Sequence, residues 1–346
     1  MNSFSAEILR WFRENGRDLP WRETRDPYAI WLSEIILQQT RIAQGWEYWE
    51  RFVQTYPKVE DLAAASEDDV LKLWQGLGYY SRARNLHTAA KQIVALGDFP
   101  NTLEGIKSLK GVGDYTAAAI GSFAFDIPAA VVDGNVYRVL SRYFGIDTPI
   151  NSTQGKKEFA ALAQSLLPAS DAASYNQGMM DFGAIQCTPQ SPKCLLCPFA
   201  ETCEALRCGR VEKLPVKNKT MKVKTRHLSY IYIRCKSSAA DGAGNSEPMI
   251  AIHRRGEGDI WQGLWEPYNV SDVKELPSFV KNPILLAKDV KHVLTHRILL
   301  ADFYLLETES RPQLPDDYIW IRESEIEDYG VPRLIEIMLE KINPAE

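Results

Sequence analysis

The stretch "LKGVGDYTAAAI", residues 109–120, decides how the helical part of this chain is interpreted. Gly111 and Gly113 permit a tight turn with exposed backbone N–H groups directly before a helix. Such a turn can hold a phosphate without contacting a base, because N–H groups and a helix N-terminus attract an anion. Two glycines alone also fit a plain helix–turn–helix without a ligand. The interpretation therefore depends on the rest of the chain.

The sequence on both sides of this turn has the periodicity of helices. In "EDDVLKLWQGLGYYSRARNLHTAAKQIVALGDFP", residues 67–100, apolar residues recur at spacings of three and four, and similar patterns continue to about residue 205. After residue 226 the character changes to β-type segments, and a closing helix is predicted by "VPRLIEIMLEKI". The β-type segments are "HLSYIYIRCK", "PMIAIHRR", "RILLADFYLLE" and "DYIWIRE". We therefore predict an all-α domain over 1–216, a basic linker over 217–225 and an α+β domain over 226–346.

Composition and charge exclude several classes of protein. The chain has 346 residues, 45% hydrophobic and 25% charged, which is ordinary for a globular protein, and its length suits two domains or three small ones. No apolar run approaches the roughly 20 residues of a membrane helix, and the N-terminus lacks the features of signal and transit peptides. We therefore expect a protein of the bacterial cytoplasm. We also expect it to be a monomer. The net charge of −5 disfavours an obvious nucleic-acid protein, yet residues 207–226 hold eight basic residues and one acid. That segment suits either a phosphate-binding surface or a solvated linker.

Two carboxylates lie in surroundings that need an explanation. Glu34 interrupts the apolar stretch "AIWLSEIILQQT", residues 29–40. A buried ionised carboxylate is costly unless it is paired, hydrated or neutralised, so this stretch alone favours a Glu that faces water or pairs with an Arg. Asp133, in "VVDGNVYRVL", follows an apolar run and precedes a new helix. In isolation that position indicates a helix N-terminal cap.

Four cysteines fall in the short segment "CTPQSPKCLLCPFAETC" with gaps of six, two and five residues. They are Cys187, Cys194, Cys197 and Cys203. A cytosolic chain disfavours disulfides. Four thiolates from one compact loop suit an iron–sulfur cluster, and a structural zinc site is the alternative. Cys208 and Cys235 fit neither pattern and are expected to be ordinary free thiols.

Taken together, these features resemble a known family. A hairpin, an Asp twenty residues past Gly113 and the cysteine loop resemble the endonuclease III superfamily of DNA glycosylases, and within it the MutY-type adenine DNA glycosylases. The resemblance extends over about 200 residues through the motifs "DLPWR", "WLSEIILQQTR", "LWQGLGYYSRARNLH", "GVGDYTAAAI", "VDGNVYRVLSR" and "NQGMMDFGAIQCTP". It implies a six-helix barrel over about 24–132 and a cluster subdomain over about 1–23 plus 133–216. After residue 226 the stretch "WQGLWEPYN" and the strands resemble the family's MutT-like (Nudix-like) domain.

The resemblance also implies a chemistry. The lyase members of the superfamily carry a Lys in the hairpin where this chain has Tyr115, which implies a monofunctional glycosylase for adenine mispaired with 8-oxoguanine or guanine. Glu34 is implied to protonate the adenine, and Asp133 to stabilise the oxocarbenium ion or to bond to it transiently. Tyr115 and Asn135 are implied to support this centre. A glycosylase/lyase of thymine-glycol type and a non-enzymatic DNA-binding or redox protein are the alternatives.

Further DNA contacts follow from the same motifs. The implied residues are Trp21, Arg22, Leu37 and Gln177 for adenine, Gln39 and Tyr79 for a wedge into the duplex, and Thr40 and Leu77 near the opposing 8-oxoguanine. Each has an ordinary alternative, such as a core position for Trp21 and Leu37 or a surface position for Arg22. The MutT-like domain is implied to recognise 8-oxoguanine through a Phe-Ser-His loop, which here reads Leu294, Thr295 and His296. This departure keeps a hydroxyl and the His but loses the aromatic ring, which leaves hydrogen bonding rather than stacking. The MutT hydrolase signature is absent from the sequence, so we expect no nucleotide pyrophosphatase activity.

The resemblance finally implies cofactors and a partner. The four cysteines of the loop would hold one [4Fe–4S] cluster with a structural or redox-sensing role, and Lys193 would face the phosphate backbone. A monovalent or divalent cation at the hairpin is a further expectation. The expected partner is duplex DNA containing A:8-oxoguanine or A:G mispairs, in the nucleoid and away from membranes.

Overall fold

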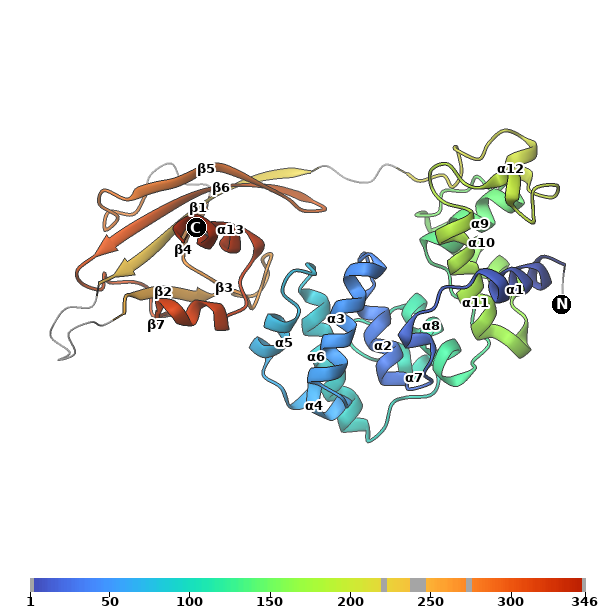
Figure 1. Ribbon diagram of the computed structural model, residues 1–346, viewed down its shortest axis with the longest axis horizontal. Helices are drawn as coiled ribbons and strands as arrows, with labels where there is room; N and C mark the ends of the chain where they lie inside the picture. Colours follow the sequence, from blue (N-terminus) through green and yellow to red (C-terminus); the bar gives the residue numbers. More distant parts are fainter. Residues whose placement is uncertain (1–2, 219–222, 237–246, 272–275, 344–346) are drawn as a thin grey trace. The chain divides into compact units, whose positions relative to one another are not determined.

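The computed structural model describes residues 3–218, 223–236, 247–271 and 276–343. The chain divides into two compact units, whose elements are drawn in Figure 1. The helical unit comprises Met1–Ala64 and Thr88–Lys219, and the sheet unit comprises Ala65–His87 and Thr220–Glu346. The predicted fold class, an all-α region followed by an α+β domain, is confirmed.

The helical unit consists of α-helices joined by short 3₁₀ and π turns. Its elements are α1 (Ser3–Asn15), η1 (Pro20–Arg22), α2 (Pro27–Ile36), α3 (Ile42–Thr55), α4 (Val59–Ala64), the larger part of α6 (Ser81–Leu96), α7 (Leu103–Lys107), α8 (Asp114–Phe125), α9 (Gly134–Phe144), α10 (Thr153–Leu166), η2 (Ala169–Asp171), α11 (Ala172–Asp181), η3 (Phe182–Gln186), η4 (Cys194–Leu196) and α12 (Glu204–Arg207). Asp26 caps α2 by accepting a hydrogen bond from the Tyr28 N–H, and Asp133 caps α9 in the same way. These caps fix where the two helices begin.

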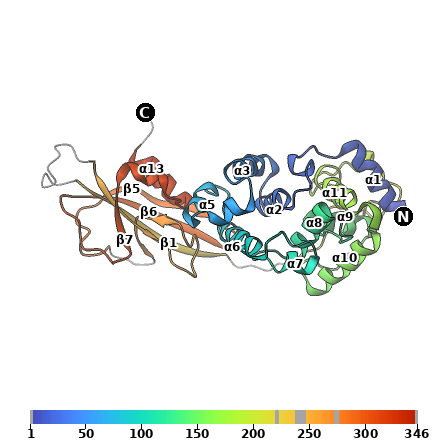
Figure 2. The same cartoon turned by 90° about the horizontal axis from the view of Figure 1, so that it is seen from below.

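Helix α2 forms the centre of one core of the helical unit. Every residue from Tyr28 to Ile36 is buried, and the helix packs against α3 and α8. A second core joins α1, α9, α10 and α11 through residues such as Ile8, Val139, Phe159 and Met179. Figure 2 shows these four helices lying close together. Both cores are apolar, so the buried carboxyl of Glu34 on α2 is an exception.

The sheet unit is built on a seven-stranded mixed sheet. Its elements are α5 (Glu67–Leu73), the first residues of α6, β1 (Lys224–Cys235), β2 (Met249–Arg254), β3 (Trp265–Glu266), β4 (Tyr268–Ser271), β5 (Ile284–Val293), β6 (Arg297–Thr308), β7 (Tyr318–Arg322), η6 (Glu323–Asp328) and α13 (Arg333–Ile342). The order is β3-β2-β1-β6-β5, with β4 also paired to β1 and β7 to β2. Strands β1 and β6 are parallel, and the other pairs are antiparallel.

The two faces of this sheet carry separate cores because successive side chains of a strand point to opposite sides. Tyr230 and Tyr232 of β1 pack in the core that contains α13, while Ile231 and Ile233 pack in the core on the other face. Strand β5 did not show in the sequence pattern. It is an edge strand with exposed apolar residues and register shifts against β6, so the alternation that marks the other strands is broken.

The compact sheet unit includes a helical segment from the first third of the chain. Residues 65–87, which the sequence pattern assigns to the all-α domain, belong to the compact sheet unit. Arg254 of β2 pairs with Glu67 at 2.9 Å and Asp68 at 3.0 Å, and Arg84 donates to the Gln262 carbonyl at 2.6 Å. These contacts join residues far apart in the chain, so helical periodicity alone does not reveal them.

Candidate active site

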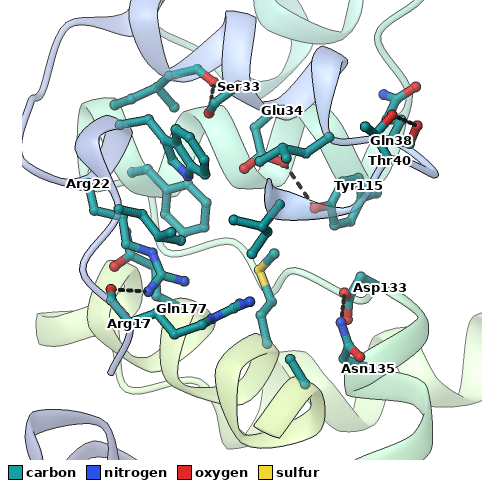
Figure 3. A pocket seen from close by; sticks show the side chains of 18 of the residues that line it. Arg17, Arg22, Ser33, Glu34, Gln38, Thr40, Tyr115, Asp133, Asn135 and Gln177 are labelled. Atoms are coloured by element: carbon teal, nitrogen blue, oxygen red, sulfur yellow. Dashed lines mark hydrogen bonds between the residues drawn. The ribbon is translucent and has the colours of Figure 1, made fainter. Parts of the chain in front are cut away.

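A cavity of about 580 Å³ lies in the helical unit between α2, α8, α9 and α11. Figure 3 shows Glu34 of α2 and Tyr115 of α8 pointing toward one another, and Asp133 and Asn135 doing the same at the start of α9. The cavity brings together ten residues that the sequence analysis singled out, namely Trp21, Arg22, Glu34, Leu37, Gln39, Thr40, Tyr115, Asp133, Asn135 and Gln177. Its volume is in the range of small-molecule sites in proteins, so it can admit one nucleobase.

Glu34 is buried in the wall of this cavity. Its exposure is 7%, and the Tyr115 hydroxyl of α8 donates to its Oε2 at 2.9 Å. Burial raises the pKa of Glu34 to about 7 against the opposing effects of the Tyr115 hydrogen bond and the Arg22 charge, while the Asp133 charge adds to the rise. The simple expectation of a solvated Glu is therefore wrong, and the carboxyl keeps a proton over much of the neutral range.

Asp133 combines a helix cap with a position in the cavity. Its Oδ1 accepts from the Val136 N–H at 2.7 Å, and its Oδ2 accepts from Asn135 Nδ2 at 2.7 Å. Burial raises the pKa of Asp133, and these hydrogen bonds together with the Arg138 charge oppose the rise. Asp133 is therefore both the N-terminal cap of α9 and a residue of the cavity lining, and the capping hydrogen bond immobilises its carboxylate.

Asn135 is itself held by groups that the sequence analysis did not identify. Arg138 donates through Nη2 to Asn135 Oδ1 at 2.8 Å and to the Gly183 carbonyl at 2.6 Å, and through Nε to the Cys187 carbonyl at 2.8 Å. A Cβ atom on Gly183 would lie 2.6 Å from the Asn135 Cβ. The bare backbone of the π-helical turn η3 therefore allows this close approach.

A second buried carboxylate, Asp181 at the end of α11, was also missed. Its side chain is 0% exposed and binds Arg17 and Arg22. Both arginines line the cavity, whereas Asp181 lies behind them. Their identities were visible in "RDLPWR" and "NQGMMDFGAIQCTP", but nothing local in the sequence pairs residues 159 or 164 positions apart.

The end of α2 carries the predicted duplex contacts of the helical unit. Leu37 is half-buried, and a Cβ on Gly45 would lie 2.5 Å from its Cδ2, so Gly45 makes room for it. Gln38 donates to Thr116 Oγ1 at 3.2 Å, while Gln39 is exposed and has a left-handed φ of 57°. A non-glycine residue in this region is uncommon and is strained relative to extended or helical backbone.

The predicted hairpin lies between α7 and α8. Gly111 has a φ of 79°, which favours glycine, and Gly113 caps α8 without a side-chain hydrogen bond. Val112 between them is buried and anchors the turn. Both glycines are exposed, so the N-terminus of α8 faces outward with its backbone uncovered.

The four cysteines of the loop line one small cavity of about 30 Å³ together with Arg142. Arg142 donates to the Cys187 sulfur at 3.4 Å and to the Thr188 and Pro189 carbonyls. Burial raises the pKa of Cys197 to about 11, and the neighbouring thiols contribute to the rise. In the described part of the chain, no group of three or more His, Cys, Asp or Glu side chains is arranged to hold a metal ion. The four cysteines of the loop nevertheless line the same cavity.

The remaining predicted residues belong to the sheet unit. Leu77 is buried, whereas Tyr79 is 46% exposed and has a left-handed φ of 49°. The Tyr79 hydroxyl is hydrogen-bonded to Thr295 in the turn between β5 and β6. Thr295 and His296 are exposed, while Leu294 packs against the core beneath α13. The Leu that replaces the family's aromatic is thus partly a core residue.

Comparison with protein families matches two parts of the chain. Residues 32–168 match the HhH-GPD superfamily of base excision DNA repair proteins, and residues 244–341 match the NUDIX domain. An adenine DNA glycosylase of Buchnera aphidicola (strain Sg) is 30% identical over 97% of this chain and 98% of its own length. The mouse adenine DNA glycosylase is 42% identical over 62% of this chain, but this match spans only 44% of the mouse protein.

Solved structures match the helical part of the chain. A thermostable thymine-DNA glycosylase is 35% identical with a TM-score of 0.56, over 59% of this chain and 95% of that one. A trapped endonuclease III–DNA covalent intermediate is 23% identical with a TM-score of 0.52, over 59% of this chain and 94% of that one, and shows the fold alone. No helix in the described ranges is long and apolar enough to cross a membrane.

Proposed function

The chain belongs to the adenine DNA glycosylase family, and we propose that it hydrolyses the N-glycosidic bond of adenine mispaired with 8-oxoguanine or guanine in duplex DNA. One observation carries the proposal. Glu34 is buried, bound to Tyr115 and placed in one cavity with Asp133, so one carboxyl favours the protonated form while hydrogen bonds hold the other in place. Two carboxyl groups with distinct environments are what the cleavage of a glycosidic bond requires.

The reaction begins with a nucleotide leaving the base stack, which costs a few kcal/mol, and entering the cavity. We assign Trp21, Arg22, Leu37 and Gln177 to the walls around the adenine, since all four line the cavity. Gln39 would enter the duplex from the end of α2, and Tyr79 would do so from the sheet unit. The left-handed backbone at both positions supports this assignment, because such strain is concentrated at functional sites.

Glu34 then acts as the general acid. Its proton moves to N7 of adenine, and the electron pair of the bond between C1′ and the base leaves with the neutral adenine. A carboxyl with a pKa near 7 is suited to this step, because it is protonated in much of the population and still acidic enough to give the proton up. Tyr115 holds the carboxyl in place through its hydroxyl.

Asp133 acts on the sugar left behind. As a carboxylate it stabilises the positive charge at C1′ or bonds to that carbon transiently. Glu34, now ionised, takes a proton from a water molecule as the water oxygen bonds to C1′. Where Asp133 has bonded to C1′, that bond breaks in the same step and its electron pair returns to the Asp133 carboxylate. The proton taken from water restores the Glu34 acid for the next turnover. Tyr115 carries no amine to form a Schiff base, so the product is an abasic site in an intact strand.

The other parts of the chain would bind the duplex. The N–H groups at Gly111 and Gly113 suit a phosphate, alone or with a cation, and Lys193 is exposed on the cysteine loop. Thr40, Leu77 and the turn Leu294–His296 are assigned to the opposing 8-oxoguanine. We place this activity in the bacterial nucleoid, with the enzyme as a monomer.

We further propose that the cysteine loop holds one [4Fe–4S] cluster. Its support is the chemistry of the donor set: four thiols from one loop line a single cavity, and Arg142 donates to the Cys187 sulfur. A bound cluster would supply redox chemistry or structural cross-linking of the loop. The protein's own Arg138 already links the Cys187 carbonyl to Asn135, beside Asp133.

The test uses a duplex with one adenine opposite 8-oxoguanine, treated with alkali after incubation. We expect strand scission only after alkali and only at the adenine. Glu34→Gln should bind this duplex and lose about 10³-fold or more in the excision rate, because general acid catalysis contributes 10²–10⁴-fold. Glu158→Gln, a change of the same kind at an exposed residue of α10, is the matched control. Scission without alkali would indicate a lyase, and no adenine release by the wild type would favour a non-enzymatic protein.

A further inference from the structure

The carboxylate of Asp181 organises two positive charges in the wall of the cavity. Arg22 donates to it in a bidentate manner, with Nη1 at 2.8 Å from Oδ2 and Nη2 at 2.8 Å from Oδ1. Arg17 donates through its backbone N–H and Nε, each at 2.9 Å, and through Nη2. The Asp181 side chain is 0% exposed, and these hydrogen bonds lower its pKa despite burial. It is therefore negatively charged at neutral pH.

The position of Arg22 matters for Glu34 because both line the same cavity. The other charged or titratable groups of the lining are Arg17 before η1, Tyr115 on α8 and Asp133 at the start of α9. Helix α3 adds only Ile42 to the cavity, and α11 adds only Gln177 and Met180. The guanidinium of Arg22 is thus one of two cationic groups in the lining, and its charge already acts to lower the pKa of Glu34.

Three contacts hold the Arg22 guanidinium where it is. The first is the bidentate pair with Asp181, a geometry that fixes the guanidinium plane. The second is a hydrogen bond from Nη1 to the Arg17 carbonyl at 3.0 Å, and the third is the ring of Phe12, 5.6 Å from the guanidinium carbon. Without Asp181 the strongest of these is lost, and a buried carboxyl is the natural new partner for the freed guanidinium.

We infer that Asp181 is a positioning residue that keeps Arg22 from forming an ion pair with Glu34, and so preserves the protonated Glu34 that adenine release requires. The inference rests on the proposed function and deepens it. Asp181 touches neither the cavity nor the base, since it acts only through Arg17 and Arg22. The Asp181 carboxylate also offsets the positive charges of Arg17 and Arg22, which would otherwise oppose a cationic sugar at C1′.

The test is the pH dependence of adenine release under single-turnover conditions with the full chain and the A:8-oxoguanine duplex. In the wild type the rate should fall as pH rises through about 7, because Glu34 loses its proton there. Asp181→Asn should move this alkaline limb to lower pH by about half a unit to one unit, so the rate falls about three- to tenfold at pH 8 and less at pH 6. Arg22→Met should move the limb the other way, although its rate is lower at every pH through the lost base contact.

Controls separate this role from a purely structural one. Asp147→Asn removes the exposed partner of Arg210, a pair outside the cavity, and should leave rate and pH profile unchanged. Asp181→Glu keeps the charge and should restore part of the wild-type limb. An Asp181→Asn rate that falls equally at all pH values would overturn the inference, as would an Arg22→Met limb that stays in place, even if Asp181→Asn fails to fold. A wild type that releases no adenine would instead refute the proposed function.

Discussion

The cavity of the helical unit and the turn of the sheet unit show two ways of presenting functional groups. In the cavity, Glu34 and Asp133 are fixed by hydrogen bonds from Tyr115, Asn135 and a helix N-terminus. In the turn, Thr295 and His296 are exposed, and the Thr295 hydroxyl is hydrogen-bonded to the Tyr79 hydroxyl. Preorganised buried groups act on the barrier of a reaction, whereas exposed groups on a turn adjust binding by small amounts. Changes in the two regions should therefore differ by orders of magnitude.

The largest effect should come from the charge of Asp133. Asp133→Asn removes the carboxylate but keeps a good N-cap, because Asn and Asp cap helices about equally well. We expect the single-turnover excision rate to fall by about 10³-fold or more, in line with the loss of a group that stabilises the transition state. Stability should fall by about 1 kcal/mol or less, from the mismatch with the Asn135 amide.

Thermal unfolding and adenine release, measured on the same sample, check this prediction. Asp26→Asn is the matched control, since Asp26 caps α2 in the same way but does not line the cavity. A large loss of stability in Asp133→Asn would show that the cap, and not the charge, accounts for lost activity. An unchanged excision rate would show that the Asp133 carboxylate takes no part in the reaction.

A smaller effect concerns the free energy of unfolding, which the burial of Glu34 lowers at neutral and alkaline pH. Glu34 has a folded-state pKa of about 7 against an ordinary value of 4.5. Between these values the native protein keeps a proton that the unfolded chain has lost, so the stability of the wild type falls as pH rises from 4.5 to 7. Glu34→Gln lacks this penalty. We expect it to gain up to about 3 kcal/mol relative to the wild type at pH 8, and nothing below pH 4.5.

Urea unfolding of both proteins at pH 4 and pH 8 measures this difference. Glu158→Gln, at an exposed site, should show no such pH-dependent gain. If Glu34→Gln is no more stable than the wild type at pH 8, then the fold does not raise the pKa of Glu34, and the carboxyl is ionised at neutral pH and cannot be the acid. The test needs no DNA, so it is independent of catalysis.

The contrast between the regions also explains what the sequence could predict. Glu34, Asp133 and the hairpin glycines lie in local patterns whose physics is short-range: an acid in an apolar helix, a cap, and a turn before a helix. Asp181, Arg138 and Gly183 act through partners that the fold brings together from distant segments, and no local pattern identifies them. The packing of residues 65–87 in the sheet unit was missed for the same reason.

The smallest effect should come from the sheet unit. Thr295→Val removes the hydroxyl and keeps the shape of the side chain, so the contact with the Tyr79 hydroxyl is lost. We expect the preference for adenine opposite 8-oxoguanine over adenine opposite guanine to fall by about three- to tenfold, which corresponds to one hydrogen bond of about 1 kcal/mol. The excision rate at A:G should not change, because the cavity is untouched.

Competition between the two duplexes in one reaction measures the preference directly. Thr308→Val is the matched control: it lies at the far end of β6, and its buried hydroxyl oxygen has no hydrogen-bond partner in the described structure. A preference that is unchanged in Thr295→Val would show that the hydroxyl retained at this position is not used for recognition. An equal loss at both mispairs would indicate instead that the turn orders Tyr79, and that the Tyr79 ring, rather than Thr295, makes the contact that matters.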